Sequence, residues 1–85
     1  MKILKFTAPW CGQCRVLSKN LKGFDVCEVI EYNVEDDNNQ EIVENYSIMS
    51  LPTMVLIDEN GVEVKRWNGI VNVNDLKSEI ESLNE

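Results

Sequence analysis

Two cysteines separated by two residues are the side chains of this sequence best suited to chemistry. Cys11 and Cys14 stand in the segment FTAPWCGQCRVL, after a short apolar run and ahead of a helical pattern. Thiols at this spacing can hold a metal ion, form a structural disulfide, or exchange electrons as a dithiol. The remaining residues have to distinguish these three uses.

The other possible metal ligands and catalytic bases in the sequence limit what these two thiols can do. The chain has three cysteines and no histidine. A structural zinc site takes four ligands, so three thiols fall short unless a carboxylate stands in. A secreted disulfide framework would need more, evenly matched cysteines. Without an imidazole base, Cys–His and Ser–His–Asp catalysis are excluded. A local redox pair is therefore the leading interpretation, with no metal and no organic cofactor, because the dithiol itself holds both electrons.

Composition predicts one small soluble domain over residues 1–85. The chain is 44% hydrophobic and 27% charged, and no apolar run approaches the roughly 18 residues of a transmembrane helix. The apolar run in the N-terminal MKILKFTAPWC is shorter than the apolar core of a secretory signal peptide, so we expect a cytoplasmic protein. A net charge of -7 with dispersed basic residues argues against nucleic-acid binding. We expect a monomer without nucleic-acid or membrane partners.

Strand-like and helix-like segments alternate along the chain. Apolar periodicity and β-branched residues predict strands at 2–6 and 26–34 and helices at 11–22 and 38–47. Two β-prone runs flank Asn60-Gly61, a pair typical of a type I′ turn, which predicts an antiparallel hairpin. Asn72 is a candidate cap for a last helix that carries Leu76 and Ile80. The order β-α-β-α-β-β-α indicates an α/β fold in which the first βαβ unit is parallel and the hairpin extends the same sheet.

This arrangement gives the two cysteines different roles. Cys11 falls at the start of the first helix, where unpaired backbone N–H groups and the helix dipole stabilise a thiolate. Cys14 lies one turn further along, close enough to bond to Cys11. We expect Cys11, at the exposed end, to attack a substrate disulfide, and the more buried Cys14 to resolve the mixed disulfide.

Two motifs carry a family resemblance. APWCGQCR (8–15) resembles the active-site segment of thioredoxins, W-C-G-P-C followed by Lys or Arg, and SLPT (50–53) resembles their cis-proline element. Gly61 and Gly69 match the hairpin and late-loop glycines of that family. Because Met1 starts directly on the strand that leads into the active site, we expect the usual leading strand and helix to be absent. The resemblance thus implies a minimal thioredoxin-like fold, with a central four-stranded mixed sheet flanked by helices.

The resemblance also implies roles for individual residues. Pro52 would be cis and face Cys11, so that the backbone of Leu51 pairs with an extended substrate; the alternative is an ordinary trans proline at a strand start. Gly12 and Gln13 would support the dithiol. A flat apolar docking surface around Cys11, with Thr53 beside it, would be formed by Trp10, Leu51, Gly69 and Ile70. For Trp10 the alternative is a partly buried packing residue.

Three positions depart from the thioredoxin pattern. Gln13 replaces the usual Pro, which leaves the loop less constrained and the redox potential altered in a direction that the sequence does not give. Lys5 stands where the family has a buried Asp, and Glu31 stands where it has the partner Lys. We expect this swapped pair to lie beneath the dithiol and handle the proton of Cys14; the alternative is that Lys5 reaches solvent and Glu31 is surface charge. Cys27 is expected to be a small buried hydrophobe rather than a regulatory thiol.

The resemblance implies a thiol-disulfide oxidoreductase that reduces protein disulfides and is recharged by a thioredoxin reductase or a similar donor. One rival is a glutaredoxin-like reductase using glutathione, although glutaredoxins usually carry Pro-Tyr between the cysteines and a Gly-Gly pair after the hairpin. Another is a thioredoxin-fold module that binds a partner while its redox chemistry is incidental. Replacing both Cys11 and Cys14 by Ser separates this last hypothesis from the enzymatic ones.

Overall fold

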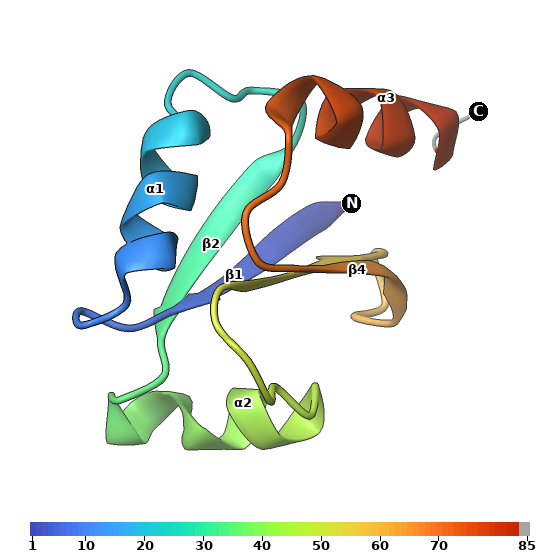
Figure 1. Cartoon of the computed structure of the whole chain (residues 1–85). Coiled ribbons are helices and arrows are strands. Elements are labelled where there is room, and N and C mark those ends of the chain that lie inside the picture. The colour runs from blue at the N-terminus through green and yellow to red at the C-terminus, as the bar shows by residue number, and fades with distance from the viewer. Residues whose placement is uncertain (84–85) are drawn as a thin grey trace.

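Four strands form one mixed sheet in the order β2-β1-β3-β4 (Figure 1). The computed structural model describes residues 1–83, so the predicted domain end at residue 85 lies outside the described residues. Strand β1 pairs in parallel with β2 and antiparallel with β3, and β3 pairs antiparallel with β4. The elements in chain order are β1 (Lys2–Thr7), α1 (Gly12–Asn20), β2 (Glu28–Asn33), a short 3-10 turn (Asp37–Asn39), α2 (Gln40–Asn45), β3 (Thr53–Ile57), β4 (Glu63–Asn68) and α3 (Val73–Leu83). The predicted order of elements and the mixed four-stranded sheet are confirmed.

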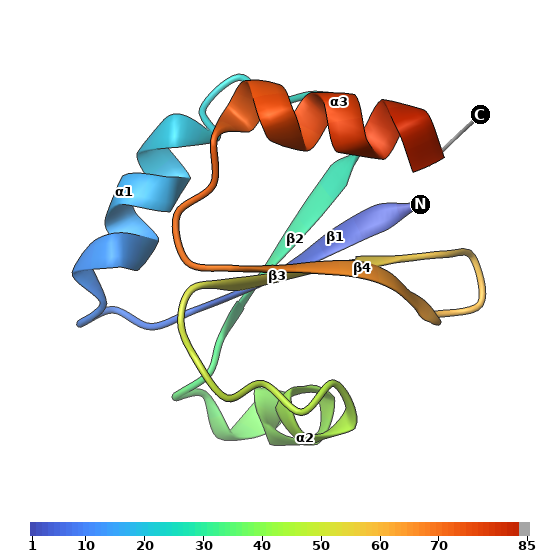
Figure 2. The same cartoon turned by 45° about the vertical axis from the view of Figure 1, so that its right-hand side comes forward.

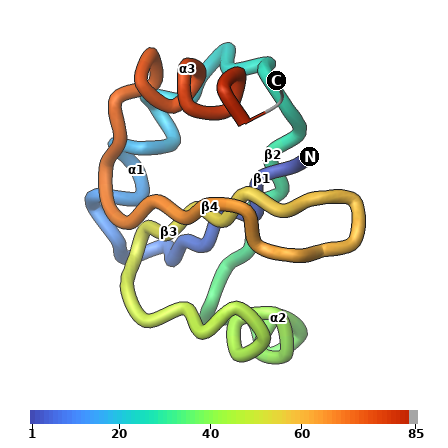
Figure 3. Tube along the Cα trace, turned by 90° about the vertical axis from the view of Figure 1, so that its right-hand side faces the viewer, coloured from blue at the N-terminus to red at the C-terminus, as the bar shows by residue number. Residues whose placement is uncertain are grey.

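The helices cover both faces of this sheet. Figures 2 and 3 show α1 and α3 on one face and α2 on the other. Because side chains alternate along a strand, β1 sends Ile3 and Lys5 toward α1 and α3, and sends Leu4 and Phe6 toward α2. Two apolar clusters result. The α1/α3 side holds Ile3, Leu17, Met54, Leu56, Trp67, Leu76 and Ile80, and the α2 side holds Leu4, Phe6, Val55 and Ile57.

The β3–β4 hairpin is present, but its turn is not type I′. A type I′ turn needs positive φ at both central residues, and among residues 1–83 the only non-glycine residue with positive φ is Ser47. The Gly61 N–H instead donates to the Asp58 carbonyl at 3.1 Å, and Gly61 itself has φ +81°. The Asp58 carboxylate accepts from the N–H groups of Asn60 and Val62 at 2.8 and 3.0 Å. The Asp58 side chain thus favours a three-residue loop in which Gly61 takes the left-handed conformation.

Capping residues set the ends of the helices. The Asn72 side chain accepts from the N–H groups of Asn74 and Asp75, which confirms the predicted cap of α3. Helix α1 ends at Asn20, two residues before the predicted end, and Gly23 follows with φ +84°. Strand β2 starts at Glu28, so Cys27 precedes it instead of lying within it. Within residues 1–83, no helix is both long and apolar enough to cross a membrane.

Candidate active site

Cys11 is the N-cap residue of α1 and forms a disulfide with Cys14. Its backbone is extended, with φ -86° and ψ 109°, and its Sγ accepts a hydrogen bond from the Cys14 N–H at 3.1 Å. The Cα atoms of the two cysteines are 5.2 Å apart. The sulfur of Cys11 therefore replaces the oxygen that usually caps a helix, and it lies where first-turn N–H groups stabilise negative charge.

The two cysteines differ in exposure as the sequence predicts, but neither is open to solvent in the disulfide form. Cys11 is 7% exposed and Cys14 is 1% exposed. Cys11 borders a groove on the α2 side of the site, whereas Cys14 borders a smaller depression on the α1 side, whose lining includes the polar residues Ser18, Glu31 and Asn33. The two cysteines thus border different hollows.

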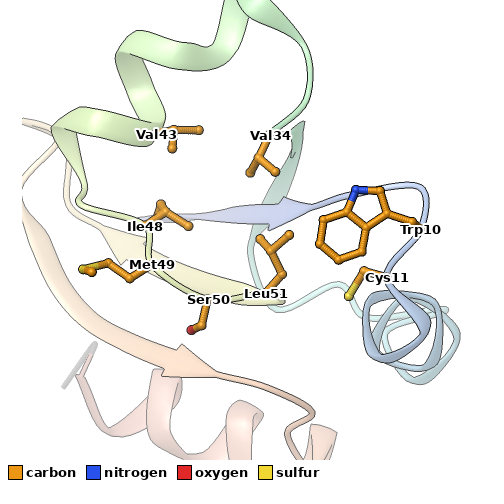
Figure 4. A pocket seen from close by; sticks show the side chains of 8 residues that line it. All are labelled: Trp10, Cys11, Val34, Val43, Ile48, Met49, Ser50 and Leu51. Atoms are coloured by element: carbon orange, nitrogen blue, oxygen red, sulfur yellow. The ribbon is translucent and has the colours of Figure 1, made fainter.

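The apolar groove is the main hollow next to Cys11 (Figure 4). Its volume is about 460 Å³. Figure 4 shows Trp10 and Cys11 at one end and the segment 48–51 along one wall, with Leu51 beside Cys11. The complete lining consists of Trp10, Cys11, Val34, Val43, Ile48, Met49, Ser50 and Leu51. The surface at Trp10 and Leu51, which the resemblance predicts to be flat, is therefore a groove that extends toward α2.

The predicted surface residues divide into two groups. Trp10 and Leu51 line the groove, and Trp10 is 66% exposed, which rules out the alternative of a packing residue. Ile70 is exposed and Gly69 half-buried, but neither lines the groove. Sequence reasoning missed the groove residues Val34, Val43, Ile48, Met49 and Ser50. The only available signal was the apolar pair Ile48-Met49 directly before SLPT.

The SLPT loop leads into β3 next to the disulfide, where Leu51 packs against the two bonded cysteines. The Leu51–Pro52 peptide bond is cis, as the resemblance implies. The Pro52 carbonyl accepts from the Gly69 N–H at 2.8 Å. Thr53 is 1% exposed, and its hydroxyl donates to the Ser50 carbonyl at 2.7 Å. The side chain of Thr53 thus lies beneath the loop and fixes its shape.

Lys5 and Glu31 form an ion pair. The Lys5 Nζ donates to Glu31 Oε1 at 2.8 Å and to the Ser18 hydroxyl. The Lys5 side chain is 6% exposed, whereas that of Glu31 is 57% exposed. Ser18 follows Cys14 by one helical turn on α1, and Glu31 borders the same polar depression as Cys14. The alternative in which Lys5 reaches solvent is wrong.

The remaining candidate residues have simpler surroundings. Gly12 and Gln13 form the exposed first turn of α1. Cys27 is half-buried and packs against the α1/α3 cluster, so it is less enclosed than predicted. Burial raises the pKa of the Cys27 thiol above its ordinary value of 9.0, which makes its thiolate scarce at neutral pH. Within residues 1–83, no three His, Cys, Asp or Glu side chains gather to hold a metal ion.

Comparisons with known proteins agree with this geometry. The thioredoxin family model matches residues 1–82. A thioredoxin from Mycoplasma genitalium is 40% identical over 73 residues, which cover 81% of this chain and 69% of that protein. A thioredoxin from Chlamydia caviae is 32% identical over 85 residues, covering 98% of this chain and 79% of the relative.

Solved structures give the same result. A mutant thioredoxin from Halobacterium salinarum superimposes with a TM-score of 0.84 at 29% identity, over 99% of this chain and 74% of that one. The match runs through the strand before the dithiol, the cysteine pair and the cis-proline loop, and the family model spans nearly all of the sequence. This chain belongs to the thioredoxin family.

Proposed function

We propose that this protein is a thiol-disulfide oxidoreductase that reduces disulfides in other proteins through Cys11 and Cys14. The observation that carries the proposal is a bonded cysteine pair at a helix start whose outer sulfur borders an apolar groove. A groove of this kind accommodates an apolar polypeptide segment next to a reacting sulfur. A purely structural disulfide would need neither the capping position nor the groove.

The reaction follows two exchange steps. The Cys11 thiolate attacks one sulfur of the substrate disulfide, that bond breaks, and the other substrate sulfur leaves and takes up a proton. Cys14 then loses its proton, and its sulfur attacks Cys11 in the mixed disulfide. The second substrate sulfur leaves and is protonated in turn. The substrate gains two electrons and two protons, and the protein ends with the Cys11–Cys14 disulfide.

The position of Lys5 and Glu31 supports a role in the second step. Cys14 and Glu31 border the same polar depression, and Lys5 holds Glu31 there through an ion pair of 2.8 Å. In this proposal the Glu31 carboxylate accepts the Cys14 proton through the depression, and the Lys5 ammonium keeps it in place. Leu51 supplies backbone hydrogen-bonding groups to an extended substrate beside Cys11. After turnover, a thioredoxin reductase or a similar donor returns two electrons to the disulfide.

Single-turnover reduction of a protein disulfide tests the proposal. The pre-reduced protein is mixed with insulin, and oxidation is followed through the fluorescence of the protein's tryptophans. We expect Cys11→Ser to abolish reduction and Cys27→Ser to retain it. Full activity in the Cys11→Ser variant would contradict the proposal.

The electron donor separates this function from the glutaredoxin-like alternative. The oxidised protein is offered either reduced glutathione or NADPH with a thioredoxin reductase. We expect the reductase to reduce Cys11–Cys14 at least tenfold faster, because Gly12 and Gln13 replace the Pro-Tyr pair usual in glutaredoxins. Faster reduction by glutathione would favour the alternative.

Lys5→Met tests the proton-transfer role. The pH profile of mixed-disulfide resolution is compared with that of wild type, with Lys2→Met on the same strand as a control. We expect slower resolution and an altered profile only in Lys5→Met, because its Glu31 is no longer held beside the depression. An unchanged profile would remove the role.

A further inference from the structure

The groove wall is a segment that leaves the regular structure between α2 and β3. Residues 48–51 form this wall, and no strand or helix contains them. Ser47, directly before it, has φ +51°, an uncommon conformation for a residue with a side chain. A segment of this kind keeps one shape only if its backbone groups are held from outside.

Arg66 on β4 holds the start of the wall. Its Nη2 donates to the Tyr46 carbonyl, and its Nη1 donates to the Ser47 carbonyl at 3.4 Å. Glu63 orients the guanidinium through two bonds, to Nε at 3.0 Å and to Nη2 at 2.7 Å. The Arg66 side chain is 24% exposed. Its planar group thus fixes two carbonyls that the short helix α2 leaves without helical partners.

Asn68, two residues later on β4, holds the end of the wall. Its Oδ1 lies 3.0 Å from the Thr53 hydroxyl and 3.4 Å from the Ser50 hydroxyl. Thr53 in turn bonds the Ser50 carbonyl. The side-chain contacts of Asn68 therefore meet the loop at Ser50, where the wall turns toward Cys11.

The alternation of β4 separates these contacts from the core. Arg66 and Asn68 point to the α2 side, whereas Lys65 and Trp67 point to the α3 side and both donate to Glu79. One face of the strand thus supports the wall, and the other face supports the core. We therefore expect a substitution on one face to leave the contacts of the other face in place.

We propose that Arg66 and Asn68 are positioning residues that set the shape of the groove wall and thereby the binding of protein disulfides. The inference rests on the proposed function of the dithiol. Neither side chain touches the reacting sulfurs, so small disulfides that do not fill the groove are insensitive to both residues. Substrates with a polypeptide segment on each side of the disulfide depend on the wall along its length.

Single-turnover kinetics of the reduced protein test this inference. Wild type, Arg66→Gln and Asn68→Ala are mixed with insulin and, separately, with 5,5′-dithiobis(2-nitrobenzoic acid). We expect each variant to raise the half-saturating insulin concentration about 3- to 10-fold, the loss typical of one or two hydrogen bonds. The limiting rate and the rate with the small disulfide should change less than about twofold. Hydrogen exchange of the Ile48 amide, which donates to the Val43 carbonyl, should accelerate in Arg66→Gln.

Lys65→Gln is the matched control, because it removes an ion pair on the other face of the same strand. It should leave the insulin concentration dependence unchanged. If the wild type is active and the folded Arg66→Gln or Asn68→Ala variant shows the same dependence on insulin concentration, the inference is wrong. The proposed function of the dithiol would still stand. Equal slowing with both substrates also contradicts it, because such a change would come from the dithiol. A wild type that reduces neither substrate contradicts the proposed function as well.

Discussion

At the scale of single residues, the two partners of the Lys5–Glu31 ion pair differ in their exposure to solvent. Lys5 is almost fully enclosed, whereas more than half of the Glu31 side chain is in contact with solvent. An enclosed ammonium without a carboxylate is costly, whereas a solvated carboxylate without its ammonium is not. The two partners are therefore not equivalent in folding, because the buried Lys5 depends on Glu31 more than the exposed Glu31 depends on Lys5.

Substitutions should reveal this inequality in the free energy of unfolding. We expect Glu31→Ala to destabilise by about 1–2 kcal/mol, because Lys5 keeps only Ser18 as a partner. Lys5→Met should change stability by less than about 1 kcal/mol, because a similar apolar side chain fills the same space. Urea unfolding of both variants measures the difference. A larger loss in Lys5→Met than in Glu31→Ala would show that the assignment of the buried charge is wrong.

At the scale of secondary-structure elements, one carboxylate joins α3 to the sheet. Glu79 accepts from Trp67 Nε1 at 2.6 Å and from Lys65 Nζ at 2.9 Å. The hydrogen bond from the Trp67 indole, and to a smaller extent the one from Lys65, lowers the pKa of Glu79 below its ordinary value of 4.5. The carboxylate form is thus favoured in the folded state.

This shift predicts how α3 responds to acid. Because the folded pKa is lower than the unfolded one, the stabilisation is complete above pH 4.5 and is lost as the pH falls through the folded value. We expect Glu79→Gln to lower stability at neutral pH and to make the loss below pH 4.5 shallower. Glu81→Gln, an exposed change on the same helix, serves as the control. Identical acid profiles for wild type and Glu79→Gln would contradict this role.

Glycines test the geometry of two other elements. Gly61→Ala should cost about 1 kcal/mol, because φ +81° is unfavourable for a residue with Cβ. Space is not the obstacle, since the added atom would lie 3.7 Å from the Tyr46 hydroxyl. Gly12→Ala, in the first turn of α1, meets no atom within 4 Å and should be neutral or slightly stabilising. Thermal unfolding compares the two, and an equal effect would argue against the turn described above.

Local sequence signals were sufficient for the elements but not for the groove. Periodicity, Asn72 and the glycines placed the helices and strands because each signal acts on its own neighbours. The turn at Asn60 is not the predicted type I′ turn, because the Asp58 side chain accepts hydrogen bonds from two N–H groups of the loop. A prediction from the Asn60-Gly61 pair alone does not include this side chain. The groove wall was missed because Arg66 and Asn68, which hold it, are about 20 residues away in sequence. The dithiol itself was recognised because its motif is contiguous.

At the scale of the whole molecule, the sheet divides the chain into two layers that meet at the dithiol. The α1/α3 layer supplies the helix start and the Lys5–Glu31 pair, and the α2 layer supplies the groove. Cys11 lies at their junction, with the cis-proline loop beside it in Figure 4. In the proposed reaction both layers are needed, because one would set the reactivity of the sulfur and the other would bind the polypeptide that it attacks.

Trapping of the first exchange step tests this account most directly. In Cys14→Ser, the mixed disulfide formed on Cys11 cannot be resolved, so incubation of this variant with oxidised insulin should accumulate a covalent adduct. Peptide mapping should place the bond at Cys11 and leave Cys27 free. An adduct on Cys27, or no adduct while wild type still reduces insulin, would contradict the central claim that Cys11 is the attacking thiol.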